Sequence, residues 1–146
     1  MVTIQCETTI NRPVETVYEY FANPDREIAR ATPGIESVER LSPGPTVPGS
    51  TFRFVHAGGP VHESTSQFTV VRPPHELQFE GVVGALRPWN QLIFEASDGA
   101  TTVRLAGKAN PTGPLRLLVP LVSIAVIVLL AAGRRAHLSR NHRGVA

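Results

Sequence analysis

The sequence predicts an α+β domain: a curved antiparallel sheet of about seven strands around one long C-terminal helix, with one or two short helices after the first strand. Three observations predict this. Residues 2–10 alternate as a half-buried strand does, six later strand-like segments are separated by short breaks rich in proline and glycine, and one long apolar segment follows them. Short breaks favour antiparallel neighbours, because a parallel crossover needs about a dozen residues.

The first strand and helix are predicted from their periodicities. In residues 2–10, every second side chain from Val2 to Ile10 faces one side. Asn11 is the expected helix cap, and Pro13 suits a first helical turn. The apolar stripe of this helix has spacings i, i+3, i+4 and i+7 and consists of Val14, Val17, Tyr18 and Phe21. The segment Asn-Pro-Asp at residues 23–25 ends it, and residues 25–34 are expected to hold another helical turn.

The rest of the chain predicts a meander and a covering helix. The expected strands are residues 35–41, 50–57, 61–71, 75–83, 86–96 and 101–109. A sheet of this size curls and needs an apolar cover on one face. Residues 114–140 would form a helix about 40 Å long, which is enough to cross the sheet. With 146 residues, we expect a single domain over residues 1–140 and a basic tail at 141–146.

Charge and cysteine content exclude several classes of protein. All twelve acidic residues lie before residue 99, whereas five arginines lie in or after the apolar segment. The body is therefore slightly acidic, which argues against a nucleic-acid partner. The single cysteine excludes an internal disulfide framework, and the N-terminus lacks the pattern of a signal peptide, so we expect a cytoplasmic protein. The basic tail suits an anionic membrane surface or, equally, a helix C-terminus.

In the order of its segments the chain resembles a known superfamily. The opening TTINRPVETVYEYFANPD, then GSTFRF, GGPVHESTSQFTVVRPPHELQFE, FEASDGATTVRL and PTGPLRLLVPL, follow the order seen in the SRPBCC superfamily. The resemblance covers about residues 2–135 and points to its polyketide cyclase/dehydrase and lipid-transport branch. It implies the START-like helix-grip fold, with a cavity between sheet and C-terminal helix for a lipid-like, sterol-like or polyketide-like molecule.

Two departures from the family pattern stand out. No tryptophan occurs in the segment DREIARATPG, where the family commonly has one. The final helix is apolar on all sides. The side expected to face the sheet carries Leu117, Leu121, Ile124 and Val128, and the opposite side is as apolar, with Val119, Val122, Val126 and Leu129.

This apolar helix has three interpretations. Residues 117–133 contain no charge and reach the lower length limit of a membrane span. With the domain in the cytoplasm, however, a span would place the arginine-rich tail outside, contrary to the positive-inside rule. The second interpretation is a covering helix whose outer side meets a second copy of the chain, and the third is a covering helix that lies on a membrane surface.

The expected ligand site follows from strand alternation together with the resemblance. The side chains expected to face the ligand are mostly apolar with a few polar groups, which is typical of small-molecule sites. They are Phe52, Phe54, His56, His62, Ser64, Ser66, Phe68, Phe79, Asn90, Leu92, Phe94 and Val103 from the sheet, and Leu117, Leu121 and Ile124 from the last helix. Val70, Leu77, Thr101 and Leu105 are expected on the same face.

The polar members of this set have both functional and structural interpretations. His62 and Asn90 are the candidate catalytic residues, since imidazole transfers protons near neutral pH and an amide can hold a water. Alternatively, both histidines that flank the turn AGGP are exposed, and the strand hydroxyls bond backbone or water. Glu63 faces away from His62, so adjacency does not make a dyad. Histidine and acidic residues have no regular metal-ligand spacing, and no cofactor motif is present, so no metal or cofactor is expected.

Three functions fit these features. The favoured one is binding or carriage of a small hydrophobic ligand, because the polar groups expected to face it are few. The alternative is an enzyme of the polyketide cyclase, aromatase or dehydratase type. The third is a membrane-associated accessory protein anchored through residues 117–133. The predicted partners are a hydrophobic small molecule and, through the outer side of the last helix, a second copy or a membrane surface.

Overall fold

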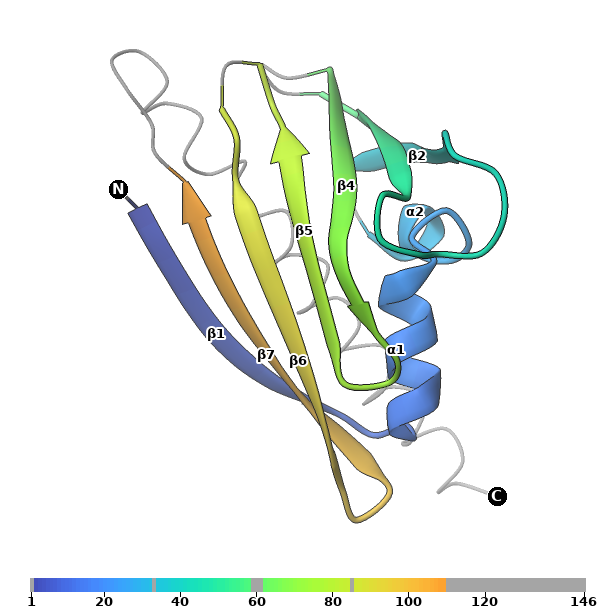
Figure 1. Ribbon diagram of the computed structural model, residues 1–146, viewed down its shortest axis with the longest axis vertical. Coiled ribbons are helices and arrows are strands. Elements are labelled where there is room, and N and C mark those ends of the chain that lie inside the picture. Colours follow the sequence, from blue (N-terminus) through green and yellow to red (C-terminus); the bar gives the residue numbers. More distant parts are fainter. Residues whose placement is uncertain (1, 33, 59–61, 85, 110–146) are drawn as a thin grey trace.

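The computed structural model describes residues 2–32, 34–58, 62–84 and 86–109 (Figure 1). Its elements follow the predicted order: β1 (Val2–Ile10), α1 (Val14–Ala22), α2 (Ile28–Ala31), β2 (Ile35–Arg40), β3 (Thr51–His56), β4 (Glu63–Arg72), β5 (Glu76–Val82), β6 (Trp89–Ser97) and β7 (Ala100–Ala109). The predicted helix over residues 114–140, with Leu117, Leu121 and Ile124, and the tail at 141–146 lie outside the described residues.

The seven strands form one antiparallel sheet in the order β1-β7-β6-β5-β4-β3-β2. β2 to β7 are a meander, and β1 joins its far edge by pairing with β7 from Val2 opposite Ala109 to Ile10 opposite Thr101. The sheet is curved, and α1 lies along one side of it (Figure 1). We call this side the inner face and the opposite side the outer face. The predicted curved seven-stranded sheet is confirmed.

Helix α1 covers one end of the inner face. Its predicted stripe is buried at Val17, Tyr18 and Phe21, and two of these rings contact Phe94 of β6, with centroids 5.5 and 5.8 Å away. Removing such side chains from water contributes roughly 1.5–3 kcal/mol each. The packing of α1 against β6 and β7 therefore follows from the 3.6-residue periodicity of its sequence.

The predicted cap of α1 is wrong. The residue before the helix is Pro13, not Asn11, and no side chain caps the helix. Pro13 has φ −58° and ψ 150°, so the chain is still extended there and the helix begins only at Val14. Asn11 is therefore too far from the first free N–H groups to accept from them.

An arginine fastens the β2–β3 loop to the end of α1. The Arg40 guanidinium donates to both carboxylate oxygens of Asp25 at 3.1 and 3.3 Å, and to Asn23 Oδ1 at 2.9 Å. It also donates to Thr46 in the loop at 3.2 Å and lies 4.8 Å from the ring centre of Phe52. This half-hidden ion pair holds a loop rich in proline and glycine against the corner between the two helices.

Two details of β4 differ from the prediction. The strand begins at Glu63 rather than at residue 61. A bulge between Phe68 and Val70 then shifts the register, so that Val70 pairs with Gln78 and Val71 pairs with Leu77. Because a one-residue slip exchanges the two faces, Val71 packs against the core and the inward direction predicted for Val70 is wrong.

Among the described residues, no helix has the combination of length and apolar character that a membrane crossing requires. The segment 117–133, on which the membrane interpretations depend, lies outside that part of the chain.

Candidate functional site

The inner face carries a row of contacting aromatic rings. Phe52 and Phe68 meet edge to face with centroids 5.6 Å apart, and Phe68 meets Phe79 in the same way at 5.7 Å. Most of the predicted ligand-facing residues from the sheet are buried on this face: Phe52, His56, Ser64, Phe68, Asn90, Leu92, Phe94 and Val103. Phe54, Ser66 and Phe79 are partly buried. Alternation along the strands thus brings this part of the predicted set together.

Asn90 is a polar residue of this face near the start of β6. It lies on β6 between Phe79 of β5 and Gly107 of β7, and it is 6% exposed. Its Oδ1 reaches over Gly107, where a Cβ atom would stand only 3.1 Å away. A glycine at that position therefore leaves the room that the amide occupies.

No hydrogen bond joins the side-chain amide of Asn90 to another described residue, although the residue as a whole is only 6% exposed. Its nitrogen and oxygen are not among the fully buried side-chain atoms that lack a partner, so they keep some contact with solvent. An amide has two N–H donors and a carbonyl acceptor, and both kinds of group are therefore open to a ligand on this face.

His56 and Ser64 form a buried pair at the end of β3. His56 Nε2 and Ser64 Oγ are 2.8 Å apart, and the residues are 5% and 9% exposed. Burial, and secondly the charge of nearby His62, lower the pKa of His56, which favours the neutral imidazole. Either partner can then donate, depending on which ring nitrogen carries the proton.

The two histidines beside the predicted turn differ in burial. His56 is buried, so its interpretation as an exposed hairpin residue is wrong, whereas His62 is exposed, as that interpretation predicted for it. The reason is that β4 begins only at Glu63, so His62 precedes the strand. Its carbonyl accepts a bond from His56 N at 2.8 Å, but its side chain is directed to solvent.

Thr101 behaves as its structural interpretation predicts. Its hydroxyl is fully buried and donates to the Arg12 carbonyl at 2.8 Å. This bond joins the start of β7 to the segment between β1 and α1, so the hydroxyl is used for structure.

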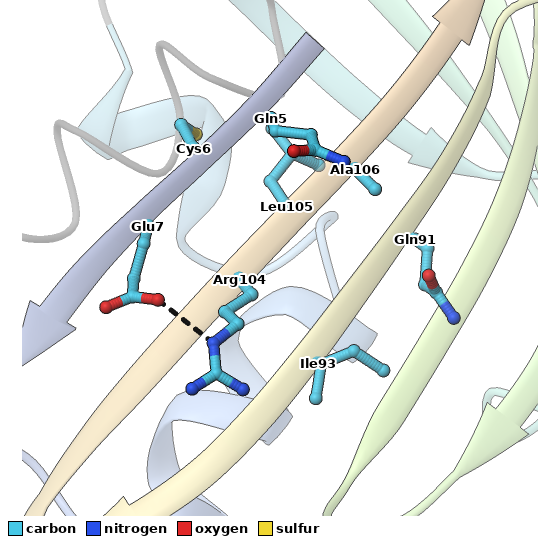
Figure 2. Close-up of a pocket in the computed structure, with 8 residues that line it drawn as sticks. All are labelled: Gln5, Cys6, Glu7, Gln91, Ile93, Arg104, Leu105 and Ala106. Atoms are coloured by element: carbon cyan, nitrogen blue, oxygen red, sulfur yellow. Dashed lines mark hydrogen bonds and ion pairs between the residues drawn. The ribbon is translucent and has the colours of Figure 1, made fainter. Parts of the chain in front are cut away.

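A hollow lies on the outer face, where no site was predicted (Figure 2). It measures about 450 Å³ and spans β1, β7 and β6, with Gln5, Glu7, Gln91, Ile93, Arg104 and Ala106 directed into it. Arg104 donates to Glu7 at 2.9 Å and to Glu95 at 2.5 Å. These partners, with Glu7 first, raise the pKa of Arg104. The charged groups are exposed and already paired with one another, so this hollow is a solvated surface and the inner face is the better candidate.

Within the described ranges, no three histidine, cysteine or acidic side chains are gathered in a way that could hold a metal ion. The groups on the inner face are amide, hydroxyl and neutral imidazole, so the chemistry they offer is hydrogen bonding and proton transfer.

The described residues form a curved antiparallel sheet with α1 on its inner face, and comparison with known families identifies the family. The model of the family described as polyketide cyclase / dehydrase and lipid transport matches residues 1–133. The chain therefore belongs to this family, which is of the SRPBCC type, as the sequence pattern had indicated. No curated protein sequence matches it.

Solved structures share the fold at low sequence identity. The Zhui aromatase/cyclase from a Streptomyces species has a TM-score of 0.74 at 17% identity, over 93% of each chain. Ara h 8.0201 has a TM-score of 0.72 at 14% identity, over 92% of this chain and 97% of its own. Norcoclaurine synthase from Thalictrum flavum, in complex with dopamine and hydroxybenzaldehyde, has a TM-score of 0.70 at 12% identity, over 97% of this chain and 87% of its own. At such identities the likeness shows the fold alone.

Proposed function

We propose that this protein binds and carries a small, uncharged, hydrophobic ligand against the inner face of the sheet, with Asn90 as its polar anchor. The observation that supports this most strongly is the Asn90 amide, which lies opposite Phe79 in a residue only 6% exposed and makes no hydrogen bond with another described residue. A ligand hydroxyl or carbonyl would satisfy it.

The surroundings of Asn90 support an uncharged ligand. The neighbouring side chains on the same face include Phe79, Leu92 and Leu105, and His56 is held neutral by burial. A charged group brought into such surroundings without a counter-charge loses several kcal/mol of hydration. A flat apolar molecule gains instead from edge-to-face contacts with the rings.

The test uses para,para'-dihydroxystilbene, a rigid neutral aromatic probe with a hydroxyl at each end. We expect saturable binding to the full chain by calorimetry and about tenfold weaker binding to Asn90→Leu, which is the loss of one to two kcal/mol of hydrogen bonding. The matched control is Gln91→Leu, since Gln91 points to the outer face and donates to Glu76 there at 2.6 Å. Equal weakening by both variants, or no saturable binding at all, would contradict the proposal.

The buried pair favours a second candidate function, an enzyme of the cyclase or dehydratase type. Here the base is His56 rather than His62. Neutral His56 would take a proton from an acidic C–H of the ligand while Ser64 Oγ accepts from the opposite ring nitrogen, and the imidazolium would then return a proton to the product. Benzoylacetone in D₂O is a suitable probe, with deuterium exchange followed by NMR. We expect His56→Gln to abolish protein-catalysed exchange and His62→Gln to preserve it; exchange that survives His56→Gln would exclude this mechanism.

A further inference from the structure

Helix α1 carries a buried polar atom on the inner side of the molecule. The phenol oxygen of Tyr18 in α1 is buried and forms no hydrogen bond. The whole residue is 3% exposed. Its ring packs edge to face against Phe94, with centroids 5.5 Å apart. A phenylalanine would pack equally well at this position, so packing alone does not explain the hydroxyl.

The hydroxyl is a hydrogen-bond donor at neutral pH. Burial, and secondly the nearby Glu19 carboxylate, raise the pKa of Tyr18 to about 12. The phenol therefore keeps its proton and can donate to an acceptor oxygen. Leaving it unpaired destabilises the fold, as for any buried donor.

The positions of Asn90 and Tyr18 define a length. Asn90 and Phe94 are four residues apart on β6, a separation of about 13 Å along a strand, and Tyr18 packs on the second of them. Between them on the inner face lies Leu92. One polar group thus lies near the start of β6 and the other beside Phe94, where α1 covers the face.

We propose that Tyr18 is a second binding residue and that the ligand is an elongated neutral molecule with an oxygen function at each end. One oxygen meets the Asn90 amide, and the other accepts from the Tyr18 hydroxyl beneath α1. The inference rests on the proposed function and deepens it, because it names the polar pattern that the site selects.

The experiment compares two probes and one conservative variant. Wild-type full chain should bind para,para'-dihydroxystilbene about tenfold more tightly than para-hydroxystilbene, since one further hydrogen bond is made. In Tyr18→Phe the two probes should bind equally, while the affinity for the monohydroxy probe should change by no more than about twofold. Tyr20→Phe is the matched control, with the same chemical change on the same helix, and it should keep the wild-type preference.

Thermal unfolding of the ligand-free chain separates a binding role from a structural one. Removing an unpaired buried hydroxyl should leave the Tm of Tyr18→Phe unchanged or higher. A lower Tm, or an unchanged preference for the dihydroxy probe, overturns the inference while the proposed function stands. If neither probe binds the wild-type chain, the proposed function fails and the inference fails with it.

Discussion

Gly107→Ala tests the position of the anchor without touching the Asn90 side chain itself. A Cβ atom at residue 107 would stand 3.1 Å from Asn90 Oδ1 and 3.8 Å from the Trp89 carbonyl oxygen. The first separation is shorter than an ordinary van der Waals contact, so the amide must move by a few tenths of an ångström. A misplaced hydrogen bond to the ligand costs about 0.5–1.5 kcal/mol, which is roughly a two- to tenfold rise in Kd for para,para'-dihydroxystilbene.

The matched control for this change is Gly81→Ala. Its Cβ would also stand 3.1 Å from a neighbour, but that neighbour is Cγ of Pro88. Both glycines lie in strands and both gain similarly from replacement by alanine in conformational entropy, about 0.5–1 kcal/mol. We therefore expect similar Tm values for the two variants and weaker binding, by calorimetry, only for Gly107→Ala. Equal losses of affinity, or none in Gly107→Ala, would refute the placement of Asn90 against the ligand.

Three further predictions concern stability. Burial lowers the pKa of His56 in the folded state, so the unfolded chain binds a proton on this imidazole more tightly than the folded chain does. The free energy of unfolding should therefore be constant with respect to His56 above about pH 6.5 and should decrease as the pH falls below that value. Urea titrations should show a much smaller decline in His56→Gln than in His62→Gln, where only the lesser contribution of the His62 charge to the His56 pKa is lost. Equal declines in the two variants would show that His56 is not the group. Arg40→Met should lower the free energy of unfolding by about 2 kcal/mol, since it leaves the Asp25 carboxylate without its partner. A loss no larger than that of an exposed ion pair would show that the Arg40–Asp25 ion pair contributes little to stability. Phe52→Ala should cost about 3–5 kcal/mol in chemical denaturation, because its side chain is fully buried; a loss below 1 kcal/mol would mean that the core is not packed as described.

The strand order was predictable because it depends on local patterns. The alternation of side chains predicted β1. The proline- and glycine-rich breaks separated the later strands, so the ends of every strand were predicted to within a few residues. The register of β4 was not predictable in full, because the bulge at Phe68 and Val70 has no marker in the sequence, and it decides which of Val70 and Val71 faces the core.

The polar part of the site was only partly predictable. Alternation correctly placed Asn90 on the inner face, but whether His56 or His62 would be buried depended on where the turn ends, and that is a property of the whole sheet. The pairing of His56 with Ser64 joins residues on different strands, which spacing alone does not reveal. The sequence predicted Tyr18 only as a member of an apolar stripe. The hydroxyl that it adds to that stripe is the one feature of the sequence that indicates a polar role.

The central claim is that ligand binds on the inner face, and NMR of side-chain amides tests it most directly. Asn90 and Gln91 are neighbours on β6 whose side chains point to opposite faces, so their NH₂ resonances report on the two faces separately. On titration of the full chain with para,para'-dihydroxystilbene, we expect the Asn90 resonances to shift saturably and those of Gln91 and Gln5 to stay in place. Shifts confined to Gln91 and Gln5 would place the ligand in the outer hollow and contradict the account.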